Sequence, residues 1–234
     1  MDWAEPCIFS PSLICLDLCN LERDVRRLEQ AGIGMLHVDI LDGHFSPSMP
    51  LGLDTVRQLR ALTDLPFDCH VMAVDNTYFI DELLDIGVQQ IVFHAETEPH
   101  VAGTLSRIRA KGVRAGLALR PATSLDVLTY PIEQCDTVLL MLINPGYASL
   151  KDEAQVPYAR RKVEDLRRLI EERAPGTAVE LDGRISQENI RQYVSCGLAD
   201  IFVVGSTCLK RSDLEGSVHS LMDLRRDLIG EEES

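Results

Sequence analysis

The chain has 234 residues, of which 45% are hydrophobic and 26% charged, and its formal net charge is −14 at pH 7. A chain of this size buries a full core, so residues 1–234 are predicted to form one domain, with a frayed acidic tail from about residue 229. The negative charge repels phosphate backbones and anionic lipids, which argues against nucleic acid and membranes as partners. The first residues are acidic where a signal peptide is basic, and no apolar run reaches membrane-spanning length, so we expect a cytoplasmic protein.

Eight short β-rich runs alternate with amphipathic helical patterns along the chain. The runs are CIFSPSLI (7–14), MLHVDIL (35–41), FDCHVMA (67–73), QIVFHAE (90–96), RAGLALRP (114–121), TVLLMLIN (137–144), TAVELDG (177–183) and IFVVGS (201–206). Between them apolar residues recur every three or four positions, as in Leu21, Val25 and Leu28. Four helical patterns end on a glycine, as helices commonly do: Gly32, Gly87, Gly112 and Gly197. Eight βα units without a GxGxxG turn favour a (β/α)8 TIM barrel, of the α/β class, over an open doubly wound sheet.

The cysteines are odd in number and lie mostly in apolar segments. They are Cys7, Cys15, Cys19, Cys69, Cys135, Cys196 and Cys208. The pattern is typical of small buried side chains. Cys15 and Cys19 have a CxxxC spacing that metal sites use, but no second pair accompanies them, so packing is the favoured interpretation.

Polar side chains interrupt three of the predicted strands. Strand two ends in His37 and Asp39, strand three carries His70, and strand seven carries Asp182. In a parallel barrel the carboxyl ends of all strands meet at one mouth, so these side chains would converge there. Two imidazoles and two carboxylates suit Zn²⁺, Fe²⁺, Mn²⁺ or Co²⁺. The alternative treats each as a hydrogen-bonded core residue, which is the commoner fate of one histidine but is less favoured for four groups together.

The motifs SPSLICLDL, HVDILDGHFSPS, DCHVM, NPGY, LDG and VVGS occur in this order along the chain. In these motifs and their order the sequence resembles the ribulose-phosphate 3-epimerase family, including its allulose-6-phosphate 3-epimerase branch. The resemblance implies a homo-oligomeric barrel that binds one divalent ion through His37, Asp39, His70 and Asp182. It also implies that Asp39 and Asp182 move a proton between the two faces of an enediolate, inverting C3 of a ketose phosphate. General physics agrees, since one base does not easily reach both faces of a planar intermediate.

The resemblance extends to residues that contact the substrate. His70 and Ser12 are expected to touch it, although a serine in SPSL is also suited to capping a local turn. Met72 and Met141 match methionines that crowd the metal, whereas core filling is the default role of a methionine on a strand. Leu41 stands where a third methionine is usual.

A phosphate site is expected in the loops after strands six to eight, where glycine-rich turns and a short helix N-terminus present backbone N–H groups. Four residues match it: Gly146, Gly183, Gly205 and Ser206. The loop GYASLKDEA departs from the glycine-rich form of the family, and Arg184 replaces a second glycine. Arg184 is expected to bind phosphate, to contact another anionic group of the substrate, or to point to solvent.

Two further residues stand at strand ends. Arg120 is a candidate cation near the mouth, with a surface loop position slightly favoured. His94 suits either an outer contact of the metal site or a satisfied structural histidine.

Other activities are known for phosphate-binding barrels. A related decarboxylase carries DxKxxD at strand three, where this chain has DCHVMAVD, and a Schiff-base aldolase needs a lysine late in a strand. All four lysines (Lys111, Lys151, Lys162 and Lys210) are predicted in helices or loops. A barrel that binds sugar phosphate without catalysis is a further alternative.

Overall fold

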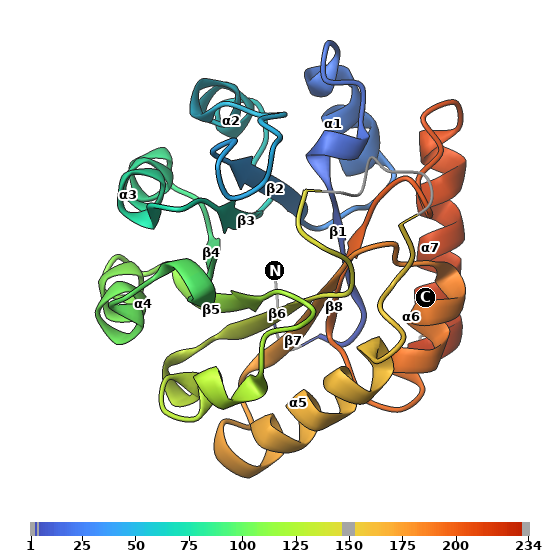
Figure 1. Cartoon of the computed structure of the whole chain (residues 1–234). Coiled ribbons are helices and arrows are strands. Elements are labelled where there is room, and N and C mark those ends of the chain that lie inside the picture. Colours follow the sequence, from blue (N-terminus) through green and yellow to red (C-terminus); the bar gives the residue numbers. More distant parts are fainter. Residues whose placement is uncertain (1–2, 4, 147–152, 231–234) are drawn as a thin grey trace.

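The computed structural model describes residues 3, 5–146 and 153–230. Within them, eight strands surround a central axis and the helices lie outside (Figure 1). The strands are β1 (Ile8–Pro11), β2 (Leu36–Leu41), β3 (Phe67–Met72), β4 (Gln90–His94), β5 (Arg114–Leu119), β6 (Thr137–Met141), β7 (Ala178–Asp182) and β8 (Ile201–Val204). The α-helices are α1 (Leu21–Gln30), α2 (Leu53–Arg60), α3 (Asn76–Ile86), α4 (Val101–Arg109), α5 (Ala159–Arg173), α6 (Gln187–Val194) and α7 (Leu214–Ile229).

All adjacent strands are parallel, in the order β1-β8-β7-β6-β5-β4-β3-β2. The barrel closes between β1 and β2 through an isolated bridge that pairs Ser12 with His37. The structure therefore confirms the predicted (β/α)8 class. Gly32, Gly87, Gly112 and Gly197 all have positive φ angles, as predicted for helix ends.

The fifth βα unit differs from the prediction, because no α-helix joins β5 to β6 in the described residues. Two short 3₁₀ helices, η3 (Leu125–Leu128) and η4 (Ile132–Gln134), take its place. Pro131 lies between them, and a proline cannot donate the backbone hydrogen bond that a continuous helix needs at that point.

The core has two parts. The larger part lies between the barrel and the helices, and it includes the predicted face of α1: Leu21, Val25 and Leu28. The smaller part fills the barrel interior towards the carboxyl ends of the strands, with Val92, Ala118, Leu139, Met141 and Ile143. Between that group and an apolar floor (Ile8, Met35, Ala178 and Ile201), several buried polar side chains occupy the interior. Their arrangement defines the site described next.

The cysteine prediction is confirmed for Cys7, Cys69, Cys135 and Cys208, which are buried, whereas Cys19 and Cys196 are exposed. Helix α7 extends to Ile229 and ends at Gly230, and residues 231–234 of the predicted tail lie outside the described part. No helix among the described residues combines the length and apolar character needed to cross a bilayer.

Candidate active site

Three strands each point two polar side chains into the barrel, two positions apart. They are His37 and Asp39 on β2, Asp68 and His70 on β3, and Glu180 and Asp182 on β7. The register of β2 and β3 pairs His37 with Asp68 and Asp39 with His70. Side chains two residues apart in a strand share one face, so the six groups form two layers along the axis.

The position of His37 corrects one expectation. It is the second residue of β2, not a residue of its carboxyl end, because β2 begins at Leu36 and extends to Leu41. Its ring nevertheless reaches the upper layer, where His37 Nε2 lies 3.4 Å from Asp39 Oδ1.

The four predicted metal ligands converge in the upper layer. His70 Nδ1 lies 3.8 Å from Asp39 Oδ1 and 3.8 Å from Asp182 Oδ2. One donor atom from each of His37, Asp39, His70 and Asp182 lies within 4.8 Å of the other three. His37 Nε2 and His70 Nδ1 are buried and have no hydrogen-bond partner among the described residues. Two buried, unpartnered nitrogens facing two carboxylates fit a divalent ion with mixed N and O ligands.

The opposite nitrogen of each ring is held by a second side chain. His37 Nδ1 lies 2.7 Å from Asp68 Oδ2, and His70 Nε2 lies 3.0 Å from His94 Nε2. Histidines that bind metals are commonly oriented through the other ring nitrogen in this way. His94 therefore contacts a predicted ligand directly, which favours the outer-contact interpretation over an isolated structural histidine.

Below the ligands, a buried hydrogen-bond network crosses the barrel. Gln90 Nε2 donates to Asp68 Oδ1 (2.8 Å) and to Glu180 Oε2 (3.2 Å), and Thr137 Oγ1 donates to Gln90 Oε1 (2.8 Å). Burial favours the neutral form of both acids, but His37 lowers the pKa of Asp68, whereas the charge of Asp68 adds to burial in raising the pKa of Glu180. One acid of this pair is thus ionised and the other protonated. Glu180 Oε1 is buried without a hydrogen-bond partner among the described residues, and His37, Asp68 and Glu180 also have metal-binding spacing.

The two aspartates of the upper layer are also electrostatically unequal. Burial opposes ionisation of Asp39, but His37 and His70 outweigh it and hold the pKa of Asp39 well below its usual range. Burial, followed by the negative charge of Asp39, raises the pKa of Asp182 to about 6. One carboxylate is therefore suited to accept a proton and the other to carry one.

A cavity opens above these groups at the mouth of the barrel. Its lining includes Asp39 and Asp182. It also includes every predicted substrate-contact residue other than His70: Ser12, Met72, Met141, Gly146, Gly183, Arg184, Gly205 and Ser206. His37 and His70 lie beneath it, fully buried. Leu41 and Cys15 complete the wall on the side of β2 and β1.

Ser12 and the methionines now have defined contacts. Ser12 Oγ donates a 2.7 Å hydrogen bond to Asp39 Oδ2, and it makes no capping hydrogen bond to η1 (Leu13–Cys15). The turn-capping alternative is therefore wrong. Met72 and Met141 are 2% and 4% exposed and border the cavity directly above the ligands, so they pack against both the core and the mouth.

The expected phosphate loops meet at one side of the cavity. Gly183 has a φ of +119°, and a Cβ atom there would approach Ile143 N to 2.9 Å, so only glycine fits between these backbones. After β8, Gly205 begins a single hydrogen-bonded turn, in which Leu209 N donates to Gly205 O. From this turn the chain passes into a bridge between Lys210 and Asp213, and no helix precedes α7 in this described segment.

Arg184 also borders the cavity. Its φ of +51° lies in the left-handed region, which is uncommon for a residue with a side chain. Its Nε donates to the backbone oxygen of Glu153 at 3.2 Å, which ties the loop after β7 to the segment before α5. Most of the altered loop, residues 147–152, lies outside the described part.

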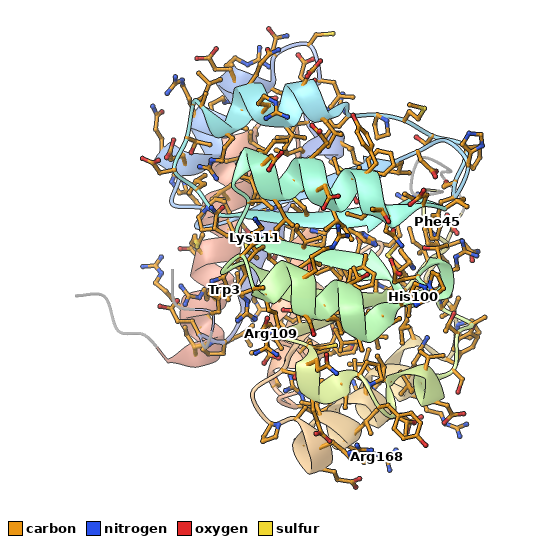
Figure 2. All side chains as sticks on the ribbon, turned by 90° about the vertical axis from the view of Figure 1, so that its left-hand side faces the viewer. Trp3, Phe45, His100, Arg109, Lys111 and Arg168 are labelled. Carbon is orange, nitrogen blue, oxygen red and sulfur yellow. The ribbon has the colours of Figure 1, made fainter. Side chains whose placement is uncertain are left out.

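Arg120 and the lysines contribute little to the cavity. Arg120 places its guanidinium 4.1 Å from the centre of the Phe45 ring, and it is not among the lining residues. Phe45 and His100 lie at the same end of the molecule, opposite Trp3 and Lys111 (Figure 2). Lys111 and Lys210 lie in loops and Lys162 on α5, as predicted, and Lys151 is outside the described residues.

Sequence reasoning missed the residues that support the ligands: Asp68, Gln90, Glu96 and Glu180. For two of them a signal was present, since Asp68 precedes His70 and Glu180 precedes Asp182 by two positions. Strand alternation places such residues on the same face.

Three comparisons with known proteins bear on this site. The model of the Ribulose-phosphate 3 epimerase family matches residues 8–209. Ribulose-phosphate 3-epimerase of Synechocystis sp. is 30% identical over 221 residues, 94% of this chain and 94% of its own length. The enzyme of the same name from Aquifex aeolicus is 32% identical over 220 residues, 93% of this chain and 96% of its own length.

Among solved structures, KGPDC from Streptococcus mutans superimposes with a TM-score of 0.68 at 11% identity, covering 96% of this chain and 99% of its own. A mutant tryptophan synthase α-subunit from Pyrococcus furiosus gives 0.65 at 14% identity, covering 97% and 99%. At such identities the likeness concerns the fold alone.

Proposed function

The chain belongs to the ribulose-phosphate 3-epimerase family, and we propose that it inverts C3 of a phosphorylated ketose through a cis-enediolate. The substrate is of the ribulose 5-phosphate/xylulose 5-phosphate type or of the allulose 6-phosphate type. One observation carries the proposal. At the mouth of the barrel, an ionised Asp39 and a more easily protonated Asp182 flank two unpartnered histidine nitrogens.

Asp39 and Asp182 are proposed to move the proton. In one direction the ionised Asp39 removes the proton from C3, and Asp182 returns a proton to the opposite face of the planar intermediate. In the reverse direction the two exchange roles. The hydrogen bond from Ser12 Oγ to Asp39 Oδ2 fixes the orientation of that carboxylate and leaves Oδ1 towards the histidines.

The cofactor is proposed to be one divalent ion, held by His37 Nε2, His70 Nδ1 and the two aspartates. When bound, a Zn²⁺, Fe²⁺, Mn²⁺ or Co²⁺ ion would supply Lewis-acid stabilisation to the negative charge that develops on the substrate oxygens. Imidazole and carboxylate donors accept all four ions, so the metal must be identified by elemental analysis.

The cavity walls suit the rest of a ketose phosphate. Met72, Met141 and Leu41 provide an apolar surface that excludes water beside the reacting carbon. On the other side, Gly183, Gly205 and Ser206 present backbone groups to the phosphate, and Arg184 offers a cation where such a backbone is common.

The proposal is tested by proton NMR in D₂O, with the metal-loaded protein and a panel that includes D-ribulose 5-phosphate and D-allulose 6-phosphate. Deuterium incorporation at C3 together with formation of the epimer on one sugar is the expected result. Binding of every sugar without exchange, by a protein shown to contain metal, would favour a non-catalytic barrel. Cleavage of a carbon–carbon bond would indicate an aldolase, although no described strand offers a lysine for Schiff-base chemistry. A keto-acid sugar phosphate is included in the panel as well, because loss of its carboxylate as carbon dioxide would indicate a decarboxylase.

A further inference from the structure

A chain of polar contacts extends outward from His70 along the end of β4. His70 Nε2 lies 3.0 Å from His94 Nε2, and His94 Nδ1 lies 3.0 Å from Glu96 Oε2. The two imidazoles are stacked, with ring centres 5.0 Å apart, and both side chains are fully buried. Phe45 covers the outer side of His94, with ring centres 4.5 Å apart. The contacts isolate this chain from solvent up to Glu96, whose side chain is 17% exposed.

The hydrogen-bond partners fix the position of each proton. Glu96 is an acceptor on both oxygens, since Oε2 faces His94, while Oε1 accepts from the backbone N–H of Arg120 (2.7 Å) and from the hydroxyl of Thr123. His94 therefore carries its proton on Nδ1 and has a lone pair on Nε2. That lone pair requires the proton of His70 to be on Nε2. His70 Nδ1 is then a lone pair, directed towards Asp39 and Asp182.

We propose that Glu96 and His94 are positioning residues for His70, selecting the tautomer in which Nδ1 binds the divalent ion. The inference rests on the proposed function, because it needs the ion at that site. Glu96 and His94 do not line the cavity, so they would act only through His70. The opposite ligand, His37, is oriented separately through Asp68, so the two imidazole ligands have independent supports.

Glu96→Gln tests this assignment with almost no change in shape. An amide at position 96 must place its NH₂ group against a donor, because all three partners of Glu96 donate. Oε1 faces two of them and Oε2 only one, so the NH₂ group is expected to face His94. His94 would then carry its proton on Nε2, opposite the proton of His70, and His70 would lose the tautomer that binds the ion.

The measurement is the affinity of the purified full-length protein for Zn²⁺ and Co²⁺, by competition with a chromophoric chelator. We expect Glu96→Gln to weaken binding by about 10- to 100-fold. Glu98→Gln is the matched control: it makes the same charge change two residues away, where the side chain accepts from His100 N and contacts neither imidazole of the polar chain, and its affinity should equal that of the wild type. The ring tautomers, observed by ¹H–¹⁵N NMR of histidine-labelled protein, should shift from Nδ1–H to Nε2–H at His94 in Glu96→Gln alone.

His94→Phe provides a second variant that keeps a ring in the same space. It removes the acceptor of His70, so we expect a loss of affinity at least as large, and no additional loss when Glu96→Gln is combined with it. Wild-type affinity in Glu96→Gln, or additive losses in the double variant, would overturn the inference and leave the proposed function intact. A wild-type protein that binds none of Zn²⁺, Co²⁺, Mn²⁺ and Fe²⁺ would overturn both.

Discussion

Asp68→Asn and Glu180→Gln should have very different effects on stability, although both exchange a buried acid of one network for its amide. Asp68 is ionised and accepts from His37 Nδ1 (2.7 Å), Gln90 Nε2 (2.8 Å) and Ser10 Oγ (3.3 Å). An amide at position 68 turns one acceptor into a donor and removes the charge that faces His37. Breaking a buried pair in this way costs about 3–5 kcal/mol of unfolding free energy.

Glu180 differs because it already carries a proton. Burial and the charge of Asp68 raise the pKa of Glu180 well above the usual range, so the folded state favours its neutral carboxyl group. A glutamine has the same length, accepts from Gln90 Nε2 through its carbonyl oxygen and donates through its amide towards Asp68. The expected loss is about 1 kcal/mol or less, the contribution of a single hydrogen bond.

Equilibrium unfolding in urea measures both effects, with a chelator present so that metal binding does not add to the stability of the folded state. The midpoint should fall strongly for Asp68→Asn and little for Glu180→Gln, at an unchanged m-value. Equal losses, or a larger loss for Glu180→Gln, would refute the assignment of charge within the pair.

Asp39→Asn and Asp182→Asn should each slow epimerisation by at least about 100-fold, because each removes one of two proton carriers. Metal content must be measured on the same samples, and exchange at the wild-type rate in either variant would contradict the mechanism. Arg184→Gly should lower the unfolding free energy by only about 1 kcal/mol, since a φ of +51° suits glycine but the hydrogen bond to Glu153 O is lost. It should raise KM by about tenfold for the preferred ketose phosphate and shift preference within the panel. KM values equal to those of the wild type for every sugar would place the Arg184 side chain outside the substrate site. Gly116→Ala should destabilise the protein by about 1–3 kcal/mol, because the new Cβ would lie 2.6 Å from Thr137 O, and an unchanged urea midpoint would show that the strands shift to accept it.

Most of the fold was predictable from the sequence because strand and helix patterns are local. The runs at 35–41, 67–73 and 177–183 became β2, β3 and β7, and their polar residues met at the mouth, as parallel strands require. The missing fifth α-helix was less visible, because a proline can begin a helix as well as interrupt one. In the structure Pro131 directly precedes the short η4 and does not begin an α-helix.

The support of the ligands was harder to foresee for a different reason. His94 could be placed at a strand end, but its contact with His70 depends on the register of β3 with β4, which pairs Val92 with His70. No local pattern encodes that register. Similarly, the left-handed backbone at Arg184 is a property of the turn after β7, and arginine itself gives no indication of it.

The polar network inside the barrel also bears on how this sequence can vary. Thr137 lies on β6, a strand that carries none of the four ligands, yet its hydroxyl bonds to Gln90, Gln90 bonds to Asp68, and Asp68 bonds to His37. A neutral drift at position 137, such as threonine to valine, would leave Gln90 Oε1 to the guanidinium of Arg114 alone. Thr137 is thus constrained by the orientation of His37, a side chain to which it is linked only through Gln90 and Asp68. Substitutions at positions 90 and 137 are expected to be accepted together rather than singly.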